Sequence, residues 1–383
     1  MKKVYLDNAA TTMVDPVIVK EMNKYHSVFY GNASSIHHAG QEAKKALEKS
    51  RAIIAKQLGA KPYEIIFTSG GTESDNLAIR GIAYEKSNRK QNKNHIITSK
   101  IEHPAVLNTC KQLEKEGFKV DYIDVNKEGI VDAEEIKKRI NSKTCLVTIM
   151  HSNNEIGTIQ PVHKIAGICN KNEIPFHTDA VQSFKKTKIN LNNISLLSLS
   201  AHKIHGPKGV GALYIKEGTR IQKIMSGGHH EFDLRPGTEN IPAIAGFAKV
   251  SELKTPIAKI KNLRNYMIKE LLEIKGSWIN GSMAKRLCNN INISFKAIEG
   301  EALVLHLSRK GIAASTGSAC SSKSLEPSHV LLATGLKPED CHGSLRLTLS
   351  KYTTKSDVDY AVREIKKAVE QLRKISPFAH SVR

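Results

Sequence analysis

The side chains best suited to chemistry follow short apolar runs that have the composition of β-strands. Asp179 follows one such run and Lys203 follows the next, so one connection and one strand separate a carboxylate from a primary amine. In an open parallel sheet, the carboxyl ends of neighbouring strands meet at one edge, where ligands bind. This pair suits pyridoxal 5'-phosphate, because the amine can hold the aldehyde as a Schiff base while the acid keeps the pyridine nitrogen protonated. A structural Asp–Lys ion pair explains the spacing equally well.

A glycine-containing segment, residues 68–74, has the composition of an anion-binding turn. It joins a predicted strand to a predicted helix through Gly70 and Gly71 and carries several hydroxyl groups. Backbone N–H groups at such a turn can close on an anion, and the helix dipole favours negative charge there. The segment has neither of the nucleotide-binding glycine patterns, so a phosphate group is favoured over a nucleoside triphosphate or a dinucleotide. An ordinary helix start is the alternative.

His103 stands directly before Pro104, a residue that suits the first position of a helix. Its ring should therefore project from a strand-to-helix turn toward the same edge, where an imidazole can stack on a planar cofactor and move protons near neutral pH. A purely structural histidine is the alternative. Loops of this kind follow all the predicted strands, and we expect one site to collect them: residues 68–74, 102–104, 151–155, 178–182 and 200–203.

The elements that position these loops alternate between β-branched runs and helical patterns. Strands are predicted at 64–67, 95–98, 145–150, 174–177 and 194–199, and helices at 39–58, 74–85, 104–116 and 133–140, the last capped by Asp132. This alternation predicts an α/β fold with a mainly parallel sheet and helices on both faces. A helix at 257–274, strands at 290–295 and 344–349 and a helix at 355–374 predict a smaller α+β domain, joined by an N-terminal strand at 4–6.

The composition excludes several classes of protein. A chain of 383 residues that is 40% hydrophobic can form one large or two ordinary domains, which excludes disordered, collagenous and disulfide-stapled proteins. No apolar stretch approaches the roughly 18 residues of a membrane-spanning helix, and Asp7 precedes any region of signal-peptide length, so we expect a cytoplasmic protein. The six cysteines form no Cys-x-x-Cys pair, and the two His-His pairs lie at no ligand spacing. Free thiols and no metal site are therefore expected.

The formal net charge of +21 raises the question of nucleic-acid binding. The basic residues are spread along the whole chain, and the single local run, residues 86–93, is typical of a solvated loop. Direct nucleic-acid binding is therefore not expected. A basic surface would still favour an acidic partner, such as tRNA or an acidic carrier protein.

Six motifs occur in the order typical of one enzyme family: residues 6–12 (LDNAATT), 31–37 (GNASSIH), 71–76 (GTESDN), 153–157 (NNEIG), 200–209 (SAHKIHGPKG) and 318–322 (SACSS). Over nearly its full length the chain resembles a cysteine desulfurase of the group I branch, which serves iron–sulfur cluster assembly. The resemblance implies a fold-type I, class V aminotransferase-like homodimer with a seven-stranded sheet. It implies a large cofactor-binding domain at 13–255 and a small domain, 1–12 with 256–383, that carries a catalytic cysteine.

The resemblance also implies a role for each matching residue. Lys203 would hold pyridoxal 5'-phosphate as a Schiff base, Asp179 would pair with the pyridine nitrogen, and His103 would stack on the ring and shuttle protons. The other cofactor contacts would be Gln182 at the ring hydroxyl and, around the phosphate, Gly71, Thr72, Ser200, His202 and Thr238 of the partner subunit. Asn154 and Arg346 would bind the substrate carboxylate, which suits the planar fork of an arginine.

Cys320 would accept the sulfur of L-cysteine as a persulfide and leave L-alanine, after the freed Lys203 has removed the α-proton. Its surroundings are small and polar, which suits a loop that swings between substrate and acceptor. Cys145 and Cys169 lie in apolar patterns typical of buried, unreactive thiols. The sulfur acceptor would be an iron–sulfur scaffold protein or a tRNA-thiolation enzyme.

Two other functions fit parts of the sequence. A related lyase or aminotransferase, such as a selenocysteine lyase, would share the cofactor residues, although a plain aminotransferase has no use for a thiol at Cys320. A basic RNA-binding protein that retains an enzyme fold is the alternative from a different class. The chain departs from the family pattern at four positions, Ala33, His229, Phe232 and Asp233, and its tail is shorter than in members whose C-terminal extension docks a scaffold protein.

Overall fold

A seven-stranded sheet forms the centre of the computed structural model, which describes residues 2–87, 92–316 and 326–377. The strands follow the order β2 (Ile65–Thr68), β8 (Gly211–Ile215), β7 (Leu196–Ser200), β6 (Phe176–Asp179), β5 (Thr144–Thr148), β3 (His95–Ser99) and β4 (Lys119–Ile123). β8 runs antiparallel to both of its neighbours, and the other strands are parallel to one another. The predicted mainly parallel α/β sheet is confirmed.

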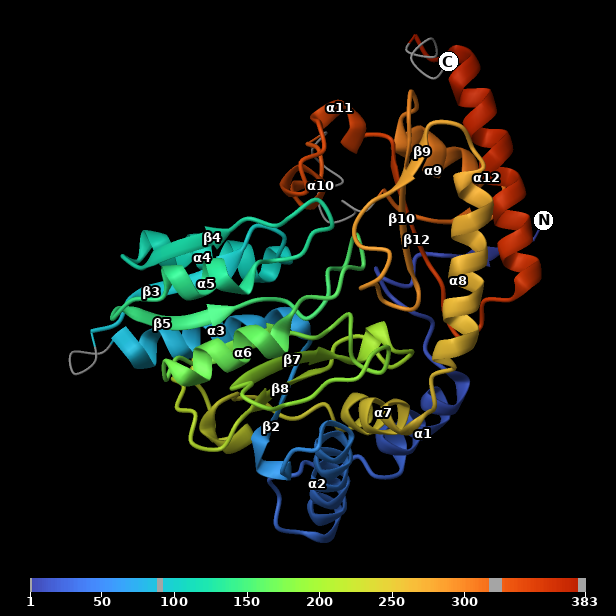
Figure 1. Ribbon diagram of the computed structural model, residues 1–383. Coiled ribbons are helices and arrows are strands. Elements are labelled where there is room, and N and C mark those ends of the chain that lie inside the picture. The colour runs from blue at the N-terminus through green and yellow to red at the C-terminus, as the bar shows by residue number, and fades with distance from the viewer. Residues whose placement is uncertain (1, 88–91, 317–325, 378–383) are drawn as a thin grey trace.

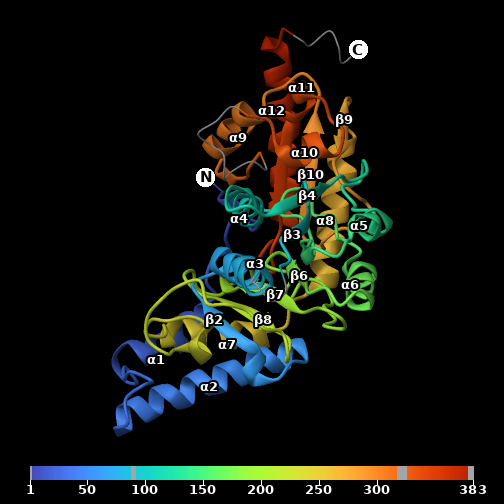
Figure 2. The same cartoon turned by 90° about the vertical axis from the view of Figure 1, so that its left-hand side faces the viewer.

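Helices cover both faces of this sheet (Figures 1 and 2) because successive strand residues point to opposite sides. Ile66 and Leu146 pack with α3 (Gly71–Ser87) and α4 (Pro104–Lys115) on one face. Phe67 and Val147, one residue later, pack on the other face with a second set of helices: α1 (Pro16–Ser27), α2 (His38–Leu58), α5 (Ala133–Arg139), α6 (Val162–Lys171) and α7 (Ile241–Glu252). Asp132 caps α5 by accepting from the Glu134 backbone N–H at 2.9 Å, as predicted.

The C-terminal part of the chain has its own apolar cluster, which includes Val4 and Leu6 from the N-terminus. Here β12 (Ser344–Thr348), β10 (Asn290–Phe295) and β9 (Ser277–Ile279) form an antiparallel sheet. The helices α8 (Ile257–Leu272), α9 (Gly300–Arg309) and α12 (Lys355–Ile375) pack with it, while β1 (Val4–Tyr5) pairs in parallel with β11 (Ile312–Ala313). This separate cluster supports our proposal that 13–255 and 1–12 with 256–383 are two domains.

The short helices α10 (His329–Ala333) and α11 (Pro338–Cys341) connect the two parts. Val330, Leu331 and Cys341 pack against Ile101 and Met150, which follow β3 and β5 of the large sheet. Figure 1 shows α10 and α11 beside the end of the sheet from which these loops emerge. The small domain therefore lies over the edge at which the sequence analysis expects the site.

The loop that carries Thr238 is fixed to the large sheet by a buried ion pair between Arg51 on α2 and Glu231. The two guanidinium nitrogens Nη1 and Nη2 lie 2.8 and 2.7 Å from the carboxylate oxygens, and one of those oxygens also accepts from the Phe67 backbone N–H at 2.7 Å. The ring of Phe232 covers the guanidinium, with its centroid 4.9 Å from the central carbon of Arg51. Phe232, one of the departures from the family pattern, thus covers a buried charge in this chain.

We predict that Arg51→Met lowers the free energy of unfolding by about 3–5 kcal/mol, because it leaves the Glu231 carboxylate buried without its counter-charge. Chemical denaturation monitored by circular dichroism measures this change. Lys61→Met is the matched control, since it removes a lysine from an exposed ion pair with Glu217 and should leave stability nearly unchanged. Equal effects of the two substitutions would contradict the prediction.

Candidate active site

A cavity of about 360 Å³ opens where the carboxyl ends of the parallel strands meet the small domain. Ten of the residues that the sequence analysis proposed for the site line it: Gly71, Thr72, His103, Asn154, Asp179, Gln182, Ser200, His202, Lys203 and Arg346. They come from the segments that follow β2, β3, β5, β6 and β7, and from β12 of the small domain. The expected convergence of five loops on one edge is therefore found.

Lys203 stands in a short 3-10 helix, Ala201–Lys203, directly after β7. Its Nζ donates to the backbone oxygens of Ala9 and Ala10 at 2.6 and 2.7 Å. The N-terminal segment therefore holds the amine in the cavity, a contact that the sequence analysis did not foresee. The same segment holds Gln182, whose Nε2 donates to the Ala9 oxygen at 3.0 Å.

Asp179 ends β6, and its carboxyl group is buried in the cavity wall. Its Oδ1 accepts from the Val181 backbone N–H at 2.8 Å. Burial raises the pKa of Asp179 to about 6, against the opposing effect of that hydrogen bond and of the nearby Lys203. A cationic ring nitrogen next to this carboxyl would lower its pKa again.

Asp75 on α3 also lines the cavity, and the sequence analysis missed it. Its Oδ1 is buried without a hydrogen-bond partner and lies 3.7 Å from Nε2 of His177. Burial and the neighbouring Asp179 raise the pKa of Asp75 well above its usual range. The available signal was helical spacing, since Asp75 follows Gly71 by four residues and therefore lies on the same face of α3.

Glu102 lies behind the cavity wall and is completely buried. Both of its carboxylate oxygens lie 3.0 Å from the Met150 backbone N–H, and Ser99 donates to one of them. Burial raises its pKa to about 8. Three neighbouring carboxyl groups, Asp75, Glu102 and Asp179, are thus each shifted toward the protonated form.

We predict that each of these raised pKa values gives the cofactor-free protein a contribution to stability that is lost as the pH rises from about 4 to about 8. A raised carboxyl pKa means that the folded state binds more protons than the unfolded state, so its stability falls with pH. Asp179→Asn removes one of these groups and should stabilise the cofactor-free protein at pH 8 by up to about 3 kcal/mol, with little effect at pH 3. Denaturant unfolding at several pH values measures the difference.

The control for this prediction is Asp124→Asn, at a position whose side chain is 79% exposed. That variant should keep the pH profile of the native chain. If Asp179→Asn has the same dependence of stability on pH as the native chain, or is less stable than the native chain at pH 8, ionisation of the buried Asp179 does not destabilise the folded protein.

The segment after β2 has the features of a cradle for a phosphate group. Helix α3 begins at Gly71, so the positive end of its dipole faces the cavity. The backbone approaches closely here, because a Cβ atom at Gly71 would lie 2.7 Å from a methyl group of Val181. The Ser200 hydroxyl is buried beside it without a hydrogen-bond partner. An unpaired donor and a helix N-terminus at one end of the cavity fit the phosphate of pyridoxal 5'-phosphate.

His202 completes this end of the cavity as a neutral ring. Its Nδ1 lies 3.1 Å from the Thr11 hydroxyl oxygen. Burial lowers the pKa of His202 to about 4, and the cationic Lys203 and Lys208 act in the same direction. A phosphate group would therefore be bound here through a hydrogen bond from the imidazole and through the helix N-terminus.

His103 caps α4, because its Nδ1 accepts from the Ala105 backbone N–H at 3.1 Å. The neutral ring therefore carries its proton on Nε2. Burial lowers the pKa of His103 to about 4, with smaller contributions from Lys203 and His329. The sequence analysis expected a ring that titrates near neutral pH, and the structure differs because the side chain is desolvated.

Arg346 on β12 reaches the cavity from the small domain and is held on two sides. Its Nη1 donates to the Asn154 backbone oxygen at 3.2 Å, and its Nη2 donates to Oδ1 of Asp7 at 3.0 Å. Its Nε is buried without a hydrogen-bond partner. A fixed guanidinium with an unpaired N–H is suited to a carboxylate ligand.

Two predicted site residues are not part of this wall. Thr238 is exposed and does not line the cavity of its own chain, and the sequence analysis assigned it to the cavity of a partner subunit. Cys320 lies outside the described residues. The five cysteines that the structure describes are buried free thiols. Cys145 and Cys169 are buried, which confirms the prediction for these two thiols, and burial raises the pKa of each to about 12.

Membrane-spanning helices and metal clusters are both absent from the described part of the chain. None of its helices is both long and apolar enough to cross a membrane. Within the same residues, no three His, Cys, Asp or Glu side chains are grouped so that they could hold a metal ion.

Comparison with known proteins places the whole chain in one family. Residues 4–361 match the family described as Aminotransferase class-V. The chain is 48% identical to "Cysteine desulfurase IscS" of Dictyoglomus turgidum, with 98% of this chain and 97% of the relative covered. It is 49% identical to the protein of the same name in Methanosarcina thermophila, with 98% and 94% covered.

Solved structures support the same family assignment. A "NifS-like protein" superimposes with a TM-score of 0.91 at 39% identity and covers 97% of this chain and 100% of its own. "SspA in complex with cysteine" has a TM-score of 0.83 at 36% identity and covers 92% and 100%. With its sheet order, its site and its full-length relatives in agreement, the chain belongs to the class V aminotransferase family and, within that family, to the cysteine desulfurases.

Proposed function

We propose that this enzyme converts L-cysteine to L-alanine with pyridoxal 5'-phosphate and transfers the sulfur to its own Cys320. One observation carries the proposal: a lysine amine, a buried carboxyl and a fixed arginine with an unpaired N–H line the same cavity as an anion cradle. The amine would bind the aldehyde of the cofactor, the carboxyl its ring nitrogen, and the anion cradle its phosphate. The arginine would bind the carboxylate of an amino acid.

The residues that would hold the cofactor divide by the part of it they bind. Lys203 would bind the aldehyde, Asp179 the pyridine nitrogen, and Gln182 the ring hydroxyl, while His103 would lie against the ring. The phosphate would be held by Gly71, Thr72, Ser200, His202 and Thr238 of the partner subunit. When bound, the cofactor supplies an electron sink for the α-carbon of the substrate.

The substrate would be oriented by its carboxylate. Arg346 would donate to it from Nε, while Asp7 and the Asn154 backbone keep the guanidinium from turning away. Lys203 would then remove the α-proton with its Nζ. His103 would enter the reaction as a neutral ring with its proton on Nε2, since burial lowers its pKa to about 4.

The transfer of sulfur from the substrate to Cys320 needs no external oxidant. The thiolate of Cys320 would attack the sulfur of the substrate, so that an S–S bond forms while the C–S bond breaks. The electron pair of that bond stays on the substrate β-carbon and takes up a proton there, and return of the α-proton from Nζ of Lys203 gives L-alanine. The products are one alanine and one persulfide on Cys320, and a thiol reductant releases the outer sulfur as sulfide.

The partners we propose follow from this product. A persulfide must pass to an acceptor, and the resemblance to desulfurases of iron–sulfur cluster assembly, together with relatives named "Cysteine desulfurase IscS", supports a scaffold protein. A tRNA-thiolation enzyme is the second candidate, favoured by the net charge of +21. We propose a homodimer, because Thr238 is exposed and away from its own cavity, and a cytoplasmic location, where the buried thiols stay reduced.

The test is an assay of the purified enzyme, loaded with pyridoxal 5'-phosphate, with L-cysteine and a thiol reductant. Equal amounts of alanine and sulfide, without any added keto acid, support a desulfurase. An absolute need for a keto acid would point to an aminotransferase, and activity with L-selenocysteine alone would point to a selenocysteine lyase. If neither product forms from any of these substrates, the proposed function fails.

A further inference from the structure

A second cavity shares Lys203 with the candidate active site but is otherwise separate from it. It is narrow, with a volume of about 30 Å³, and lies where the connection after β6 meets the small domain. Five lysines line it, namely Lys185, Lys186, Lys203, Lys254 and Lys351, together with His205 and Cys288. No aspartate or glutamate of the described residues is in its wall. A cavity with this lining has a strongly positive potential.

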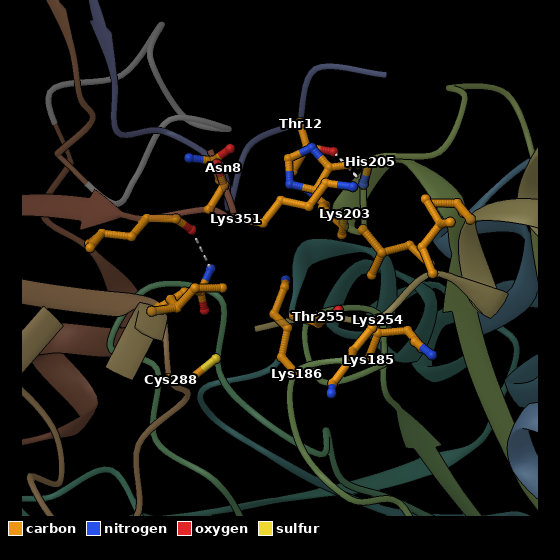
Figure 3. A pocket seen from close by; sticks show the side chains of 17 residues that line it. Asn8, Thr12, Lys185, Lys186, Lys203, His205, Lys254, Thr255, Cys288 and Lys351 are labelled. Atoms are coloured by element: carbon orange, nitrogen blue, oxygen red, sulfur yellow. Dashed lines mark hydrogen bonds between the residues drawn. The ribbon is translucent and has the colours of Figure 1, made fainter. Parts of the chain in front are cut away.

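Lys186 is the central residue of this cavity. Its side chain is only 9% exposed, and Figure 3 shows its amine directed toward the middle of the space. The hydrogen bond it makes within the described residues is donated to the Gln182 backbone oxygen at 3.1 Å. An ammonium group has three N–H donors. Lys186 therefore has donors left for a ligand that accepts hydrogen bonds.

None of the neighbours neutralises this charge. Burial lowers the pKa of Lys186 to about 8, with Cys288 acting against this shift and Lys203 acting with it, so the amine is mostly protonated at pH 7. The thiol of Cys288 points into the same space (Figure 3), but burial raises its pKa, so it is uncharged at that pH. His205 has a lowered pKa, again through burial, and is neutral. Burying an ammonium group without a counter-charge is costly.

Several charged groups around the cavity are hydrogen-bonded or ion-paired with groups outside its wall. Lys351 is paired with Asp15 outside the wall, and Asp15 also accepts from the Tyr352 hydroxyl. Lys185 donates to the side-chain oxygen of Gln57 at 3.2 Å. Arg264, packed behind Cys288, adds a further positive charge and donates to backbone oxygens such as that of Leu287 at 2.6 Å. The cavity thus lacks an anion that its own residues could supply.

We propose that this cavity binds a small monovalent anion of halide size, which is chloride in ordinary solution. The volume of about 30 Å³ accommodates about two water-sized particles. This room is sufficient for one halide ion. The ion would accept from Lys186 and would lie between the large domain, which carries Lys186, and the small domain, which carries Cys288. Its role is to neutralise the buried amine and to fasten the two domains beside Lys203.

Two measurements on the full-length enzyme test this proposal. Crystals grown or soaked in bromide should show an anomalous peak within hydrogen-bond distance of Nζ of Lys186. In solution, the unfolding temperature should be about 1–2 °C higher in potassium chloride than in potassium gluconate at equal ionic strength, because the halide binds the folded state only. An absent peak, or equal unfolding temperatures in the two salts, would overturn the proposal.

Variants separate this site from a general salt effect. Lys186→Met should remove both the bromide peak and the difference between the two salts, whereas Lys254→Met, which removes the same charge from an exposed position in the rim, should keep both. Cys288→Asp places a carboxylate in the cavity while retaining Lys186, and it should abolish halide binding even if Lys186→Met does not fold. A salt difference that persists in Cys288→Asp would assign the effect to another part of the surface. These readouts do not depend on turnover, so they stand apart from the proposed desulfurase activity.

Discussion

The Lys203→Ala variant is expected to form alanine from L-cysteine at least about 10³-fold more slowly than the native enzyme. General acid–base catalysis by a positioned side chain contributes about 10²–10⁴-fold, and this amine would also bind the cofactor. The structure offers no substitute at that place, since the neutral His103 carries its proton on Nε2 and already uses Nδ1 to cap α4. The rate of alanine formation with saturating L-cysteine measures the loss.

A second readout separates a chemical role of Lys203 from a structural one. Borohydride treatment of the cofactor-loaded native enzyme should attach the cofactor to Lys203, as seen by mass spectrometry of the digested chain, and it should attach nothing at that position in Lys203→Ala. Lys254→Ala, which removes an exposed lysine, should retain both the label and the activity. If the label appears on a different lysine, or if Lys203→Ala keeps more than about a tenth of the rate, our assignment of Lys203 is wrong.

The second large effect is expected for Cys320→Ser, which should reduce sulfide release to the background level. A hydroxyl group cannot accept the sulfur as a persulfide, so the substrate C–S bond has no nucleophile to receive its sulfur atom. The variant should still bind pyridoxal 5'-phosphate and L-cysteine, because all the residues proposed for binding are unchanged. The change in the cofactor absorbance on adding L-cysteine therefore serves as the positive signal that binding survives.

Cys169→Ala is the matched control, because it removes a thiol buried in the core of the large domain, away from the cavity. It should keep the 1:1 ratio of alanine to sulfide. A Cys320→Ser enzyme that makes both products at the native rate would leave the reaction in place but would remove Cys320 from it. Loss of the absorbance change would instead mean that the substitution disturbs binding.

The parts of the fold that could be predicted are those with a strong local pattern. The strands β2, β3, β5 and β7 have apolar centres because both of their faces are buried, and β6 begins within the short apolar segment 174–176. Edge strand β4 escaped prediction because it is partly exposed and its sequence, KVDYI, mixes polar and apolar residues. Strand β8 escaped because it begins with glycine and alanine, which have weak strand preference. Its antiparallel direction is a property of the assembled sheet that no local pattern specifies.

The features of the site also divide into those that a local sequence pattern predicts and those that only the folded chain shows. Residues at the ends of predicted strands, such as Asp179 and Lys203, could be placed together because the geometry of parallel sheets brings strand ends to one edge. The backbone oxygens of Ala9 and Ala10, which hold the lysine amine, could not be foreseen, because any residue type has such an oxygen. The lowered pKa of His103 likewise depends on burial by segments far away in the chain.

The hydrogen bonds of the N-terminal segment bear on when the enzyme becomes active during its synthesis. Asn8 donates to the Thr348 backbone oxygen at 2.6 Å, the Ala9 backbone N–H donates to the hydroxyl of the same threonine at 2.9 Å, and Asp7 pairs with Arg346. Residues 7–9 therefore find these partners only after about 340 further residues have been made. A nascent chain can close its cavity in this way only after translation has passed Thr348, so we expect alanine and sulfide to form only after that point.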